Sequence, residues 1–312
     1  MNTREVLNDV ENLKVFESLV ETMRTMGSGL YPKLNRKIAP AEKNYKSVLA
    51  GMNSVKSFLL TDKSESITNP LILRSFANES KGKVLIIPVG SNRAFCGDVN
   101  RKIIKKTEEL VEELVTANRE FSLIPIGKKL NNAFQNVSKN ISAHFNFPEK
   151  AFKTDDHSEF IPIFNYIVKQ EFSSLIIVYT KLINLGEGRG NDTIPTDFEV
   201  TPFTKPEKNI KTLSDSDALK RDVILEPSPE EAIHGLIGQY LFTSLHVTLL
   251  HSLTSINYRR MNSMNQASKS IKDEIMKLSR TLAKERKRII TKNLIEVISA
   301  SIQEKELEKQ IR

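Results

Sequence analysis

The feature that most constrains this chain is its last part, which contains neither proline nor glycine after Gly238, up to Arg312. Because these are the two residues that weaken helices most, the stretch predicts one uninterrupted helix. Ser228, Pro229 and two glutamates precede it and are typical of a helix start. Apolar residues at 4-3-4 spacing predict a coiled-coil seam: Ile271, Ile275, Leu278 and Leu282. At about 1.5 Å per residue such a helix spans ~100 Å or more, so most of it must project beyond an ordinary domain.

Residues 1–60 predict a second long helix, because their apolar side chains recur at three- and four-residue steps. Gly27, Gly29, Pro32 and Pro40 interrupt this pattern, and we expect kinks or a short break there. A single long helix would leave its apolar stripe in water. The two ends of the chain are therefore predicted to pair as an antiparallel coiled coil.

The middle of the chain has a different pattern, in which apolar runs of strand length alternate with segments of helical spacing. The strand candidates are 84–89, 121–127 and 173–180, and the helix candidates are 101–119, 130–141 and 159–171. This alternation predicts an α/β sheet with parallel strands. A turn-rich loop at 186–192 then leads to a last extended piece at 196–203. The predicted fold is a coiled coil of terminal helices (1–65 and 228–312) with an inserted Rossmann-like α/β domain at 70–225.

The loop after the first predicted strand, Gly90–Asp98, has two interpretations. It lacks both GxGxxG and GxxxxGK[ST], the glycine patterns of phosphate-cradling loops. A phosphate at the N-terminus of the following helix is one alternative. The other is a structural turn in which Asp98 caps a helix over 99–118.

Residues capable of chemistry are few. Cys96 is the only cysteine, which excludes an intrachain disulfide and a cysteine zinc site, and a small buried side chain is favoured over a nucleophile. The acids of 155–159 could bind a metal, but acids before a helix favour capping. The three histidines of the last helix lack zinc-binding spacing and are interpreted as packed or solvated: His234, His246 and His251. We predict no catalytic residue, no metal and no cofactor.

The net charge of +8 indicates an acidic partner, which could be nucleic acid, an anionic membrane or an acidic protein face. A basic band at 284–288 is either a solvated face or a helix end enclosed by other protein. Apolar residues on several faces next to it favour enclosure: Ile289, Ile290, Leu294, Val297 and Ile298. No stretch is apolar enough for a membrane span, and the charged N-terminus does not resemble a signal peptide.

Three motifs, in the same order, resemble the gamma subunit, or central stalk, of rotary F-type ATP synthases. That family's SDRGLCGGxN turn is similar to residues 91–100, its ARMxAMxxA to 259–267, and its RxxxITxELxEIVSG to 286–300. The chain departs from the pattern at Asn92, Asp98 and Asn293, and at 18–30, where little but Met23 is kept. The resemblance identifies a divergent member of the family.

The resemblance implies a rotor shaft without catalytic activity of its own, one copy inside a hexamer of alpha and beta subunits. An epsilon-type subunit and possibly a proteolipid ring would be further partners, at the cytoplasmic face of the membrane, with no nucleic acid. Residues implied to contact the stator are Met23, Arg259, Arg260, Arg286, Arg288, Leu294, Val297 and Ile298. Residues implied to form the structural turn are Arg93, Cys96 and Gly97. A rotor of a repurposed motor, such as gliding machinery, a basic nucleic-acid-binding coiled coil and a nucleotide enzyme are the alternatives.

Overall fold

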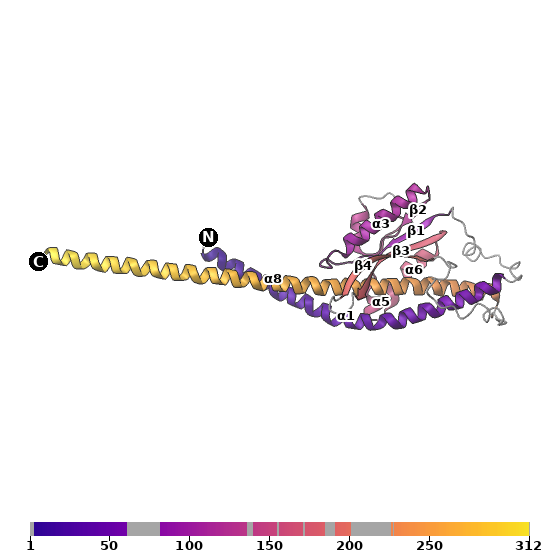
Figure 1. Cartoon of the computed structure of the whole chain (residues 1–312), viewed down its shortest axis with the longest axis horizontal. Helices are drawn as coiled ribbons and strands as arrows, with labels where there is room; N and C mark the ends of the chain where they lie inside the picture. The colour runs from indigo at the N-terminus through magenta and orange to yellow at the C-terminus, as the bar shows by residue number, and fades with distance from the viewer. Residues whose placement is uncertain are drawn as a thin grey trace. The chain divides into compact units, whose positions relative to one another are not determined.

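The computed structural model describes residues 3–60, 82–135, 140–154, 156–170, 172–184, 191–200, 226 and 228–311. The chain forms two compact units: Met1–Met26 with Met261–Arg312, and Gly27–Arg260. Two long helices, α1 (Thr3–Leu60) and α8 (Pro229–Ile311), contribute to both (Figure 1). Both predicted long helices are thus confirmed. Residues 61–81 and 201–225, with parts of the predicted segments, lie outside the described residues.

The Gly27–Arg260 unit is built on a four-stranded sheet of order β2-β1-β3-β4. β1 (Val84–Pro88) lies between β2 (Phe121–Leu123) and β3 (Ser174–Asn184) and is parallel to both. The crossover from β1 to β2 contains α3 (Val99–Thr116). The crossover from β2 to β3 contains α4 (Lys128–Gln135), α5 (Glu149–Lys153), η2 (His157–Glu159) and α6 (Ile161–Val168). The predicted parallel α/β alternation is confirmed for these three strands.

The last strand differs from the prediction in its start and is antiparallel. β4 (Asn191–Val200) begins five positions before the predicted extended piece, and Asn191 pairs with Asn184 of β3. A parallel connection needs a crossover of a dozen residues or more. The link at 185–190, which lies outside the described residues, is too short for that, so the chain returns as a hairpin.

Helices cover both faces of the sheet because its strands are apolar on both sides. Val84 and Ile86 of β1 belong to a cluster with α3 and α4, while Leu85 and Ile87 face the other way. On that second side the core includes α5, α6 and the Gly27–Arg260 portions of α1 and α8 (Figure 1). Tyr240 of α8, 2% exposed, is among its largest buried side chains. Both long helices therefore form part of this core.

Helix α1 continues through Pro32 and Pro40, so the break considered from the sequence does not occur. Each proline costs ~3 kcal/mol in a helix interior. Both prolines are on the exposed side of α1, where a carbonyl that loses its helical partner can be hydrated. On the opposite side Leu34 and Met52 are each 1% exposed in the core, and burial of such side chains contributes about 1.5–3 kcal/mol apiece. Packing of Leu34 and Met52 into the core therefore outweighs the cost of the prolines and keeps the helix intact.

In the other unit, the two chain ends run antiparallel. Val6 and Val10 of α1 form a buried cluster with Leu282 of α8, and Glu17 lies 3.8 Å from Lys272 in an ion pair. Positions further along α1 thus contact positions earlier in α8, as antiparallel helices require. Leu278, from the predicted seam, packs against the same cluster.

His251 of α8 is a buried histidine that predicts acid sensitivity. Its Nε2 lies 3.0 Å from Oε1 of Glu42 on α1, and its ring is 6.1 Å from that of Tyr179 on β3. Burial lowers the pKa of His251 below 6.5, and Lys181 of β3 acts in the same direction, while Glu42 opposes them.

The unfolded chain therefore binds a proton on this histidine more readily than the folded chain does. The free energy of unfolding is expected to keep its full His251 contribution above pH 6.5 and to lose it as the pH falls from 6.5 toward the folded-state value. Chemical denaturation between pH 5 and 8 measures this. In His251→Gln, the free energy of unfolding should fall less steeply toward acid pH than it does in the parent chain. An unchanged pH dependence of that free energy in the variant would contradict the assignment.

Candidate functional site

The loop after β1 is a hydrogen-bonded turn at the surface of the Gly27–Arg260 unit. The Asn100 side chain accepts from the Ser91 backbone N–H at 3.0 Å and donates to the Sγ of Cys96 at 3.2 Å. Cys96 is 2% exposed, which confirms the prediction of a small buried side chain. Gly97 has φ +62, and Phe95, at φ +64, holds a conformation unusual for a bulky residue. Arg93 is exposed on this turn.

Asp98 does not cap the following helix through its side chain, contrary to the sequence prediction. Its carboxylate instead lies 3.0 Å from Nζ of Lys102 and 3.9 Å from Nε of Arg259 on α8. Partial burial raises the pKa of Asp98, but the hydrogen bond and charge of Lys102, with Arg259, outweigh it and hold the pKa below its usual range. Asp98 therefore joins the turn to α8 rather than closing the helix end.

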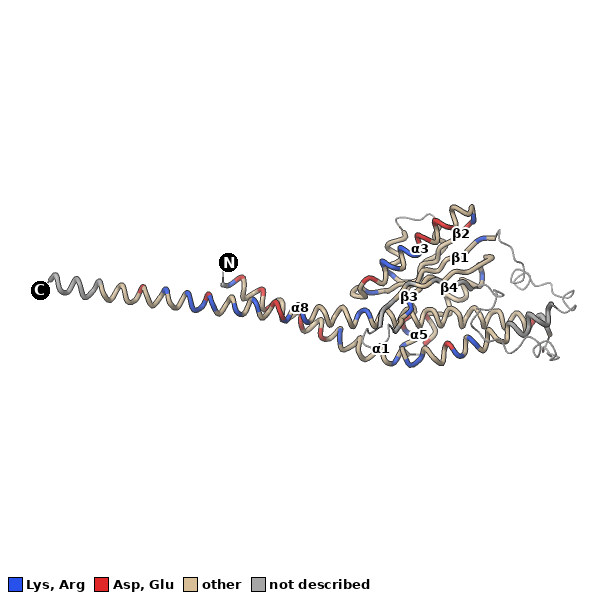
Figure 2. Tube along the Cα trace, in the orientation of Figure 1, with Lys and Arg blue, Asp and Glu red and all other residues tan. Residues whose placement is uncertain are grey.

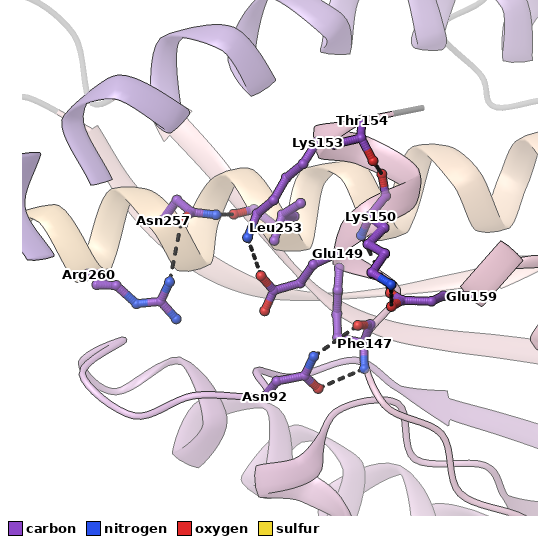
Figure 3. Close-up of polar contacts among 10 residues, drawn as sticks. All are labelled: Asn92, Phe147, Glu149, Lys150, Lys153, Thr154, Glu159, Leu253, Asn257 and Arg260. Atoms are coloured by element: carbon purple, nitrogen blue, oxygen red, sulfur yellow. Dashed lines mark hydrogen bonds and ion pairs between the residues drawn. The ribbon is translucent and has the colours of Figure 1, made fainter. Parts of the chain in front are cut away.

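Asn92 joins the turn to the segment before α5, a role that sequence reasoning missed. Its Nδ2 donates to the Phe147 carbonyl at 2.9 Å, and its Oδ1 accepts from the Phe147 N–H at 2.8 Å (Figure 3). The Lys128 N–H also approaches Oδ1, at 3.3 Å. An aspartate, which the resembling family carries here, cannot donate. The departure from the family pattern was the signal that could have found this clamp.

Asn92→Asp is expected to lower the free energy of unfolding by about 1–3 kcal/mol, because the Phe147 carbonyl loses its donor and faces a carboxylate. Urea denaturation of the full chain measures the change. Asn146→Asp, at an exposed neighbour, adds the same charge without removing the clamp. Equal losses in both variants would contradict this role.

The two arginines at the end of the α8 portion of this unit have different surroundings. Arg259 pairs with Asp98, as described. Arg260 is half-buried and donates a long hydrogen bond, 3.5 Å from its Nη1 to Oδ1 of Asn257 (Figure 3). No carboxylate in the described residues lies within ion-pair distance of it. Burial lowers the pKa of Arg260, which Glu149 partly opposes.

The predicted contact residues of the other unit lie mostly on the surface. Arg286 and Arg288 are exposed, and Arg288 lies 3.8 Å from Glu285. Leu294, Val297 and Ile298 are 57%, 67% and 56% exposed, whereas Met23 is half-buried. More exposed apolar side chains surround these three: Ile289, Ile290, Ile295 and Ile302. Cationic residues recur along the same part of α8 (Figure 2). The predicted contact residues therefore fall into two groups, one in each of the two compact units.

Other polar candidates have structural roles. Asp156 accepts from the Ser158 N–H at 3.0 Å and caps η2, as its position before a helix predicted. Ser228 does the same for α8, accepting from the Glu231 N–H at 3.3 Å. Within the described residues, no three potential ligands gather as a metal site would require. None of the helices described combines the length and apolar character needed to cross a membrane.

Comparison with known proteins covers nearly the whole chain. A family profile described as ATP synthase matches residues 2–301. An ATP synthase gamma chain of Prochlorococcus marinus subsp. pastoris is 26% identical over 96% of this chain and 99% of its own length. Another, from strain MIT 9215, is 27% identical with the same coverage.

Solved structures share the fold. One is the rotor of the Euglena gracilis mitochondrial ATP synthase in rotational state 1, with TM-score 0.57 and 13% identity over 92% of this chain and 98% of that one. A second, from the same organism's OSCP/F1/c-ring assembly in rotational state 3, has TM-score 0.61 and 14% identity over 96% and 93%. From its profile match and its full-length relatives, this chain belongs to the ATP synthase gamma chain family.

Proposed function

We propose that this chain is the central rotor shaft of a rotary F-type ATPase. The observation that carries the proposal is the run of exposed apolar side chains at 289–302 of α8. A helix that is apolar on several faces is normally buried, yet within the described residues nothing covers these side chains. An enclosing ring of other subunits would remove this surface from water.

Such a shaft acts by shifting the conformational equilibria of the subunits that surround it. A shaft without threefold symmetry presents a different face to each of three beta subunits. Each face favours a different nucleotide affinity, because a contact can shift a subunit's equilibrium only by its differential binding energy. Rotation and the nucleotide state of the ring are thereby coupled, while the bond chemistry stays in the ring and the shaft itself is not catalytic.

Specific residues are assigned to this contact. Leu294, Val297 and Ile298 would form an apolar bearing, and Arg286 and Arg288 would face acidic segments of beta, because all five are exposed. Met23, Arg259 and Arg260 are kept as candidate contacts with weaker support, since each is at least half-covered by its own unit.

The finer architecture belongs to the same proposal. We assign the terminal segments 1–65 and 228–312 to an antiparallel coiled coil and 70–225 to a Rossmann-like domain. The antiparallel contacts of Val6 and Val10 with Leu282 support the coiled coil, and the parallel strands β2-β1-β3 support the domain. Partners would be alpha and beta subunits, an epsilon-type subunit and a proteolipid ring, at the inner face of the cell membrane.

The experiment uses the tagged chain purified from its host with its partners. Recovery of alpha and beta subunits with a proteolipid ring supports a synthase, whereas alpha and beta with other partners indicates a repurposed motor. Val297→Cys, combined with a cysteine at the facing beta surface, should form a reducible cross-link that stops ATP hydrolysis until reductant is added. Recovery without any ATP-hydrolysing ring would refute the proposal.

A further inference from the structure

A polar cleft in the Gly27–Arg260 unit gathers cationic side chains from separate stretches of the chain. Its volume is about 580 Å³. Arg93 comes from the turn after β1, Lys128 from the start of α4, and Lys150 and Lys153 from α5. Sequence separation of up to sixty residues shows that the tertiary fold, rather than a local charge run, brings these cations together.

The carboxylates that line the cleft already form ion pairs within the chain. Glu149 pairs with Lys153, and Glu159 lies 3.5 Å from Nζ of Lys150 (Figure 3). Arg93 and Lys128, in contrast, are exposed and form no ion pair with a described residue. The cleft therefore carries positive charge that the described chain does not neutralise.

We propose that this cleft binds a phosphate-bearing anion. Arginine and lysine side chains converging from different elements provide the charge-assisted donors that phosphate oxygens prefer. The volume lies within the range of small-molecule sites. The clamp between Asn92 and Phe147 holds two walls of the cleft together. Little conformational entropy is therefore lost from the cleft when an anion binds. The anion's source is a free phosphate compound or a lipid headgroup, and the inference does not depend on the rotor function.

The test is calorimetric titration of the full chain with inorganic pyrophosphate at low ionic strength. Arg93→Gln with Lys128→Gln should raise the dissociation constant about tenfold or more, as expected for lost charge-assisted bonds. The matched control is Arg101→Gln with Lys105→Gln, which removes two exposed cations of α3 and should change affinity less than about twofold.

Vesicles of phosphatidylglycerol in phosphatidylcholine distinguish the two sources. Vesicle binding that pyrophosphate displaces, and that the cleft variant loses, indicates a lipid headgroup. Pyrophosphate binding without vesicle binding indicates a free phosphate compound. The proposal is overturned if the unchanged chain does not bind pyrophosphate, if the two double variants lose affinity equally, or if only polyglutamate binds, which would indicate an acidic protein partner.

Discussion

Val297→Asp is expected to weaken assembly of the chain with its alpha and beta subunits by about 100-fold or more. Val297 is 67% exposed in the chain itself, so the change removes no internal packing. In an enclosing ring the valine side chain would contribute ~1.5–3 kcal/mol, and a buried unpaired carboxylate adds a further cost. Together these exceed the ~2.7 kcal/mol of a 100-fold change. Binding of labelled chain to the purified ring measures it.

The matched control is Val115→Asp, at the end of α3. Val115 is 61% exposed, so both variants replace an equally accessible valine with the same charge. We expect Val115→Asp to leave assembly with alpha and beta nearly unchanged and Val297→Asp to retain the free energy of unfolding of the parent chain. Val115→Asp should lower that free energy by no more than about 1 kcal/mol, because its carboxylate lies in the last turn of α3. Assembly of Val297→Asp at parental affinity would remove the apolar bearing from the proposed function.

Gly127→Ala is expected to destabilise the Gly27–Arg260 unit by at least ~3 kcal/mol. Gly127 has φ +116, a conformation that residues with a Cβ avoid. An added Cβ would lie 2.5 Å from the Gly90 carbonyl oxygen, a backbone atom that cannot rotate away. Backbone strain costs about 1–3 kcal/mol by itself, and the steric overlap adds to it. Denaturant unfolding of the full chain measures the loss.

Gly29→Ala provides the opposite control, because Gly29 lies inside α1 and an added Cβ meets nothing within 4 Å. Alanine at an exposed helical position is expected to stabilise by about 0.5–1 kcal/mol. Variants with opposite signs would show that the close approach of Gly90 and Gly127, rather than glycine replacement in general, controls stability. Similar small effects at both positions would contradict the steric argument.

Much of the architecture could be predicted because its signals are local or periodic. The absence of proline and glycine in α8, and the alternation of apolar runs with helical spacing around β1 and β3, depend only on neighbours along the chain. The break expected at the prolines of α1 was wrong, because the cost of a proline is local. The packing that outweighs this cost, through Leu34 and Met52, involves segments distant in the sequence. The predicted helix cap of Asp98 was wrong for a similar reason, because its carboxylate is bound by Lys102 and by Arg259 of the distant α8.

Helical propensity and hydrophobic period depend on residues that are close together along the chain. The amino-acid sequence was therefore enough to predict two long terminal helices, a parallel α/β middle, and an apolar, basic C-terminal helix whose surface requires a partner. The folded chain was needed to show that Asn92 clamps Phe147 and that Arg260 lacks an acidic partner in the described chain. It was also needed to show that one cleft is lined by Arg93, Lys128, Lys150 and Lys153. The physical reason is that electrostatic and hydrogen-bonding partners are set by distance in space, which a linear pattern does not specify.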